Sequence, residues 1–216
     1  MDRHDDWVNW INAEMEKPYV QEIIAEATRR NQKGILSPDP DHWFDCLRFP
    51  DITKINTIIV GNSPYIHSYA ADGFAFSSLD DVDTEMQRLY AKIYADLGVC
   101  YNLSDNTKQR WLDQGILCFP LSFTTPSGKA YRYDPLWHPL TENILHYFIT
   151  EKQIRAYLFF DYSTSYRMPR LFHDKMNQPH LFIQRDIYTP EFMKGDIFNT
   201  VNDFIWKNYQ KELDWS

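Results

Sequence analysis

The stretch that decides the fold reads Ile55-Asn56-Thr57-Ile58-Ile59-Val60-Gly61-Asn62-Ser63-Pro64-Tyr65. Its first part, residues 55–60, is short, apolar and rich in β-branched side chains, which is typical of a strand buried on both faces. Gly61 ends the run. Because a strand of this kind needs helices on both faces of its sheet, the stretch indicates an α/β architecture with parallel strands.

The same alternation of apolar runs and helical stripes continues along the chain. Three further strands are predicted at residues 115–119, 156–160 and 180–184. We therefore expect one α/β domain over residues 1–216, with a central four-stranded parallel sheet flanked by helices on both faces. Apolar residues spaced three and four apart predict six helices. The first starts at Trp7 and breaks near Pro18, the second runs from Pro18 to Gly34, and the third opens at Asp80 or Asp81 and ends at Gly98. The others cover residues 140–148, lie between 165 and 176, and include Ile197 to Ile205.

Composition excludes several classes of protein. Apolar residues make up 44% of the 216 residues and aromatic residues 16%, which excludes an intrinsically disordered chain. No apolar run approaches the ~18 residues of a membrane helix, and the polar N-terminus is no secretory signal. The net charge of −8 gives no global basic field, although a DNA-binding protein needs only one positive face.

The cysteine count indicates a reducing compartment. Cys46, Cys100 and Cys118 are odd in number, far apart and without a CxxC spacing. We therefore expect neither a disulfide framework nor a zinc site, but three buried small hydrophobic side chains in an intracellular protein, cytoplasmic or nuclear. The remaining histidines and carboxylates complete no metal set either, so no metal and no cofactor is predicted. Residues 37–40, Ser-Pro-Asp-Pro, are predicted to form an exposed loop.

In parallel α/β sheets, ligands bind outside the carboxyl ends of the strands. The segments that carry function should therefore follow Val60, Phe119, Phe160 and Gln184.

The segment after the first strand carries a recognisable pattern. Residues 61–65 read Gly-Asn-Ser-Pro-Tyr, and residues 73–77 read Gly-Phe-Ala-Phe-Ser. In these residues the chain resembles the main family of uracil-DNA glycosylases, whose first motif is G-Q-D-P-Y followed by G-L-A-F-S. Further landmarks fall in the family's order: Lys17-Pro18-Tyr19 near the start, Trp111 with Gln114-Gly115 before the second strand, and Leu213-Asp214-Trp215 at the end.

The resemblance implies a protein that binds single- or double-stranded DNA and rotates one nucleotide out of the stack into a pocket. In that family the aromatic residue of the second motif stacks on the extruded base, and Phe76 occupies its place. The tyrosine of the first motif stands against C5 of the base and rejects thymine, which is the place of Tyr65. The flat walls of a pyrimidine pocket are therefore expected to remain, with Asn62 beside them.

Three polar groups of the family differ in this chain. Ser63 stands where the family has the aspartate that holds the attacking water, and a neutral hydroxyl supplies no comparable field. Pro120 replaces the asparagine that reads uracil, and Arg185 falls within one or two residues of the catalytic histidine. On this basis we do not expect efficient uracil excision by the family's usual route.

We predict instead an enzyme that flips a modified pyrimidine and does altered chemistry on it. It would be a glycosylase of changed specificity, or a transferase acting on a hypermodified base of the kind that phage DNA-modifying systems use. The alternative is a catalytically silent DNA-binding or processivity protein, or a decoy that captures a DNA-mimicking glycosylase inhibitor. In the catalytic version Ser63, Arg185 and Asp186 carry the reaction, with Asp72 as a second candidate carboxylate.

Several side chains could contact the DNA around this pocket. Ile187 or Tyr188 could wedge into the helix in place of the family's intercalating leucine. Four cations follow the second and third strands and could form a basic rim on the acidic chain: Lys129, Arg132, Arg167 and Arg170.

Each of these residues also has a purely structural interpretation. Ser63 and Asn62 can be turn residues that bond their own backbone. Phe76 and Tyr65 can belong to the core. Arg185 can pair with Asp186, and the four cations can be ordinary solvated side chains.

Overall fold

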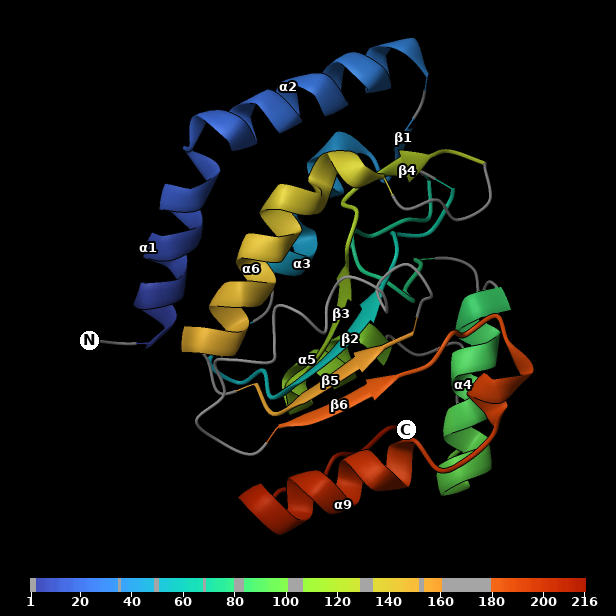
Figure 1. Cartoon of the computed structure of the whole chain (residues 1–216). Coiled ribbons are helices and arrows are strands. Elements are labelled where there is room, and N and C mark those ends of the chain that lie inside the picture. Colours follow the sequence, from blue (N-terminus) through green and yellow to red (C-terminus); the bar gives the residue numbers. More distant parts are fainter. Residues whose placement is uncertain are drawn as a thin grey trace.

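Four parallel strands form the centre of the fold (Figure 1). In sheet order they are β3 (Ile116–Pro120), β2 (Thr57–Gly61), β5 (Ala156–Phe159) and β6 (Leu181–Gln184). The computed structural model describes residues 3–34, 36–48, 51–67, 69–79, 84–100, 107–128, 134–151, 154–160 and 180–216. The predicted α/β class and all four predicted strands are confirmed, each within two residues of the expected bounds.

Alternate side chains of β2, β3 and β5 enter two separate hydrophobic cores, one on each face of the sheet. Ile58 and Val60 of β2 pack on one face, and Ile59 between them packs on the other. The first face is covered by α1 (Arg3–Met15), α2 (Pro18–Lys33), α3 (Asp45–Arg48) and α6 (His138–Glu151). The second is covered by α4 (Thr84–Leu97), α5 (Thr107–Gln114) and α9 (Phe198–Tyr209).

The helices follow the predicted stripes with a few differences. Pro18 begins α2, where its missing N–H costs nothing, and α4, α6 and α9 lie on the expected segments. The eight-residue helix α5 was not predicted. The helix expected between residues 165 and 176 and the helix start at residues 80–83 lie outside the described residues. Within the described part of the chain, no helix is both long and apolar enough to cross a membrane.

A second, two-stranded sheet lies above the carboxyl end of the main sheet, where β1 (Leu36–Ser37) pairs antiparallel with β4 (Thr125–Pro126). The prediction of an exposed loop over residues 37–40 is therefore wrong at Ser37, which is fully buried and donates its Oγ–H to the carbonyl of Tyr65. Short 3-10 helices complete the described elements: η1 (Pro40–His42), η2 (Pro135–Trp137) and η3 (Pro190–Met193). Cys46 and Cys118 are buried as expected, whereas Cys100 is exposed.

Candidate functional site at the carboxyl edge of the sheet

The ring of Phe76 lies against the last residue of β2. A Cβ built on Gly61 would stand 2.8 Å from Cε2 of Phe76, so only glycine allows the ring to come this close. Phe76 itself has a positive φ of 51°, which is rare for an aromatic residue and costs about 1–3 kcal/mol. Its ring meets Phe160, just after β5, edge to face at 6.4 Å. The structure thus holds a strained aromatic residue across the ends of two central strands, and Phe76 keeps 7% of its surface exposed.

Ser63 lies two residues beyond the end of β2 and is buried, with 4% of its surface exposed. Its Oγ has no hydrogen-bond partner in the part of the chain that the structure describes. Buried hydroxyls nearly always have a hydrogen-bond partner. One without a partner in the protein is therefore available to a water molecule or a ligand. The simple turn interpretation, in which the hydroxyl bonds its own backbone, is therefore wrong for Ser63.

The ladder between β2 and β3 continues into the loops that follow them. The N–H of Leu121 donates to the carbonyl of Gly61 (2.9 Å), and that of Ser122 donates to the carbonyl of Asn62 (2.8 Å). Pro120 is opposite Gly61 in the register and ends β3 as predicted. Because β3 is an edge strand, a residue without an N–H is tolerated there. Asn62 and Pro120 are thus brought to the same edge as Ser63.

Asp72 holds the turn that carries Phe76. Its Oδ1 accepts the N–H of Phe74 (3.2 Å), while its Oδ2 accepts the hydroxyl of Ser77 (2.6 Å) and the ammonium of Lys108 (2.7 Å). The carboxylate is buried, so these donors are what stabilise its charge. With its oxygens engaged in this way, Asp72 positions the aromatic turn and is not a free replacement carboxylate.

Cys118 on β3 is no candidate nucleophile. Burial raises the pKa of its thiol well above the ordinary range, and the negative charge of Asp72 raises that pKa further. The thiol therefore stays protonated and behaves as a small apolar side chain.

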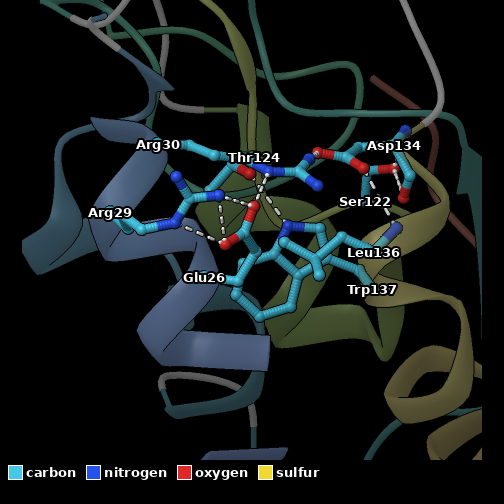
Figure 2. Close-up of polar contacts among 8 residues, drawn as sticks. All are labelled: Glu26, Arg29, Arg30, Ser122, Thr124, Asp134, Leu136 and Trp137. Carbon is cyan, nitrogen blue, oxygen red and sulfur yellow. Dashed lines mark hydrogen bonds and ion pairs between the residues drawn. The ribbon is translucent and has the colours of Figure 1, made fainter. Parts of the chain in front are cut away.

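The segment after β3 is fastened to α2 and η2 by the contacts drawn in Figure 2. The N–H of Asp134 donates to Oγ of Ser122 (2.7 Å), and Nε1 of Trp137 donates to Oγ1 of Thr124 (2.8 Å). Arg30, already paired with Glu26, donates Nη1 to Oδ2 of Asp134 (2.9 Å). Lys129 and Arg132 fall between these fixed points but, like Arg167 and Arg170, lie outside the described residues.

The segment after β6 is held by an arginine that sequence reasoning did not single out. Arg88 of α4 donates Nε to the carbonyl of Ile187 and Nη2 to the carbonyl of Thr189 (2.9 Å). Ile187 is buried, with 1% of its surface exposed, so it cannot be the side chain that inserts into the DNA helix. Tyr188 is 46% exposed and remains a candidate for that role. No local sequence pattern marks Arg88, because its two partners lie about a hundred positions further along the chain.

Arg185 and Asp186 do not pair with each other. Arg185 is exposed and donates Nη1 to the neighbouring carbonyl of Gln184 (2.8 Å). Oδ1 of Asp186 accepts the N–H of Tyr188 (2.9 Å) and closes a turn. Partial burial raises the pKa of the Asp186 carboxyl, and the nearby Arg88 guanidinium opposes that rise. In the described ranges, no three side chains that bind metals gather into a possible metal site.

The chain is similar to known proteins over nearly its full length. No protein-family model matches it. A protein of Lachnoclostridium phytofermentans named uracil-DNA glycosylase is 24% identical over 220 residues, which span 98% of this chain and 96% of that one. Another of that name from Enterococcus faecalis is 30% identical over 145 residues, or 66% and 64% of the two chains. A crystal structure of a mimivirus UNG variant in complex with UGI superposes with a TM-score of 0.78 at 16% identity, covering 97% of this chain and 87% of that one.

These relatives overturn the functional part of the sequence prediction. Relatives that align along nearly the full chain carry the name uracil-DNA glycosylase, so the expectation of altered chemistry on a modified base is wrong, as is the expectation that ordinary uracil excision is lost. The silent or decoy alternative is set aside on the same ground. Replacement of three family residues, at Ser63, Pro120 and Arg185, therefore does not decide the function of the chain. An enzyme that lacks its reacting groups can keep ~10³–10⁴-fold catalysis over water through its remaining contacts.

Proposed function

We propose that this chain, which belongs to the uracil-DNA glycosylase superfamily, removes uracil from DNA by hydrolysing the bond between N1 of the base and C1′ of deoxyribose. The observation that carries the proposal is the similarity to proteins of that name along 98% of the chain. In the reaction, the N1–C1′ bond breaks and its electron pair leaves with uracil. A water oxygen then bonds to C1′, and the water's proton ends on the departing base.

Phe76 and Tyr65 are proposed to form the walls of the base pocket. An extruded uracil would lie on the ring of Phe76, which Gly61 allows to sit at the edge of β2. Tyr65 is buried four positions beyond Gly61, and its carbonyl is fixed by Ser37. A ring fixed in this way would meet C5 of the base and exclude the methyl group of thymine. Asn62 and Pro120 would line the same pocket from the ends of β2 and β3.

Ser63 is proposed to hold the attacking water, because its buried hydroxyl has a free bonding capacity at this edge. A hydroxyl orients the water but does not neutralise the positive charge that grows on the sugar. Asp186 is the carboxylate we propose for that role. It follows β6, and with β5 between β2 and β6 the two strand ends are about 10 Å apart, a separation that leaves room for a nucleotide between them.

The outer contacts would be made with the DNA backbone. Arg185 is exposed next to the proposed pocket and can give a phosphate the two parallel hydrogen bonds that arginine favours. Tyr188 is the exposed side chain that could fill the space left by the extruded nucleotide. Four further cations are proposed as phosphate contacts from their place in the sequence: Lys129, Arg132, Arg167 and Arg170. A protein with this substrate would work where DNA is kept, inside the cell.

The direct test is release of uracil from single- and double-stranded oligonucleotides that contain one deoxyuridine. The unaltered protein should release uracil and leave an abasic site, and Phe76→Ala should abolish the release. Oligonucleotides with thymine in place of uracil should remain intact. If the unaltered protein releases no uracil from either substrate, the proposal fails.

A matched pair of variants separates the role of Ser63 from general packing. Ser63→Ala removes a buried hydroxyl that has no protein partner, so the free energy of unfolding should stay the same or rise, while uracil release slows by at least tenfold. Thr125→Val removes another such hydroxyl, from β4, and should leave both stability and release unchanged. Equal release by Ser63→Ala and the unaltered protein would remove Ser63 from the reaction.

A further inference from the structure

Three aromatic rings follow one another from the proposed pocket to the solvent. The ring of Tyr65 meets that of His67 edge to face, with centroids 5.3 Å apart. His67 in turn stacks on Tyr69, with ring centroids 5.5 Å apart and 22° between the ring planes. Tyr69 is 71% exposed, the highest value among the exposed large hydrophobic side chains of the described residues. The series therefore ends in a flat ring that has His67 on one face and most of its surface in solvent.

The backbone beneath these rings is fixed from several sides. The N–H of Gly128, beyond β4, donates to the carbonyl of Ile66 (2.9 Å). The N–H groups of Ala70 and Ala71 both donate to the carbonyl of His67 (3.1 and 2.9 Å). Ala70 and Ala71 are themselves buried, so they hold the loop against the body of the protein. A ring on such a support loses little conformational freedom when a partner stacks on it.

From this arrangement we infer that Tyr69, backed by His67, is a stacking platform for an unpaired nucleobase of the DNA strand, next to the nucleotide that enters the pocket. The inference rests on the proposed function. Every nucleobase has a π-face, so stacking on a tyrosine tolerates any sequence. A base within a duplex is covered by its neighbours, so the platform favours single-stranded or locally opened DNA.

The location of the ring supports a nucleic acid rather than another ligand. Tyr69 lies four positions after Tyr65 in the loop that follows β2, at the edge where the proposed pocket opens. A structural role for the ring is hard to sustain, since a side chain that is 71% exposed adds little to the core. Truncating one aromatic stacking residue in single-strand binding proteins costs about 1–3 kcal/mol, or about 5- to 150-fold in affinity.

The test measures affinity for a uracil-free, fluorescein-labelled oligothymidylate by fluorescence anisotropy. Tyr69→Ala should weaken binding at least fivefold, whereas Tyr69→Phe and Tyr69→Trp, which keep a ring, should bind as the unaltered protein does. Trp206→Ala is the matched control, because Trp206 is a 51% exposed aromatic residue on α9. Three positions further on, Tyr209 lies under Arg155, just before β5, so this part of α9 is at the opposite edge of the sheet.

The loss caused by Tyr69→Ala should be the same at low and high salt, since stacking is not an interaction between charges. Unchanged affinity of Tyr69→Ala, an equal loss in Trp206→Ala, or no binding by the unaltered protein would overturn the inference. Failure of the proposed function looks different. A protein that binds the oligothymidylate through Tyr69 but releases no uracil keeps the platform and loses the glycosylase assignment.

Discussion

The loop after β2 and the segment after β6 both reach the carboxyl edge of the sheet, yet they are held in different ways. In the first, the contacts that place the aromatic ring are near in sequence: Gly61 makes space for Phe76, and Asp72 binds Ser77 five residues away. In the second, the backbone is held by Arg88, whose bonds reach Ile187 across 99 positions and Thr189 across 101.

This difference separates two parts of the proposed site. The proposed base pocket at Gly61 and Phe76, called the slot below, is formed by close packing, so a small change in volume there should disturb the fold as well as the activity. The segment after β6 first continues the ladder with β5, since the N–H of Arg185 donates to the carbonyl of Phe159 (2.9 Å) and that of Ile187 to the carbonyl of Phe160 (3.3 Å). Beyond that point the Arg88 guanidinium binds its backbone, so we expect its outer part to loosen without Arg88 while the sheet stays intact. The slot should therefore be rigid, and the β6 segment should be the part that adjusts to the DNA.

The largest effect is expected from Gly61→Ala. The added Cβ would stand 2.8 Å from Cε2 of Phe76 and 3.0 Å from Cβ of Ala75, so the ring must move. Such overpacking costs about 1–3 kcal/mol of unfolding free energy, measured by urea denaturation, and uracil release should be lost because the ring leaves the base position. Gly34→Ala is the control, since a Cβ there meets nothing within 4 Å and both properties should stay unchanged.

Gly61→Ala also tests the premise that the slot is rigid. If the variant were as stable and as active as the unaltered protein, Phe76 would have moved aside without consequence. The ring would then be ordinary core, and the contrast between the two regions would disappear.

A smaller and more local effect is expected from Arg88→Ala. The carbonyls of Ile187 and Thr189 lose a charged donor, which costs about 1–3 kcal/mol, and amide hydrogen exchange should rise in residues 185–190 but not in 73–77. Uracil release should fall through kcat/KM because Arg185 and Asp186 lose their position. Arg88→Lys should restore only part of the lost stability and activity, because an ammonium cannot donate the two hydrogen bonds in the fixed, planar geometry of a guanidinium.

Arg29→Ala is the matched control for Arg88. Arg29 is an exposed arginine of α2 that pairs with Glu26 on the surface, so its loss should cost at most about 0.5 kcal/mol and leave hydrogen exchange near β6 unchanged. If Arg88→Ala raised exchange across the whole sheet, the β6 segment would be part of the core and not a separately held region.

The same difference explains how far the sequence alone could lead. The strands, the sheet covered on both faces and the edge at which ligands bind follow from the period and composition of adjacent residues, and Phe76 was indicated by the resemblance to a family motif. Contacts between distant segments have no such period. Ser37 on the carbonyl of Tyr65, Lys108 on Asp72 and Arg88 on Ile187 join residues 28, 36 and 99 positions apart, and no local pattern indicates them.

The functional error has a related cause. Ser63, Pro120 and Arg185 are three positions at which the chain departs from the family's polar residues, whereas the similarity to the relatives extends over 98% of the chain. The structure adds what the pattern lacked at one of these positions: the hydroxyl of Ser63 is buried without a protein partner instead of serving a turn. At Arg185 the structure rules out one of the alternatives, the structural pair with Asp186, because the two side chains have other partners.

The smallest effect is expected in the pH dependence of the unfolding free energy, which tests whether the charge of Arg88 acts on the carboxyl of Asp186. Burial raises the pKa of the Asp186 carboxyl above its unfolded value of about 4, so its contribution to stability is fully present below that value and is lost as pH rises through the folded pKa. The unfolding free energy of the unaltered protein should therefore fall relative to Asp186→Asn as pH rises above 4. In the Arg88→Ala background the fall should be steeper, because the guanidinium that opposes the rise in the pKa of Asp186 is gone.

Asp214→Asn is the control and should give the opposite slope, since hydrogen bonds from Ser216 lower the pKa of Asp214. A flat difference for Asp186→Asn in both backgrounds would mean that the β6 segment leaves Asp186 in solvent and that Arg88 holds only the backbone.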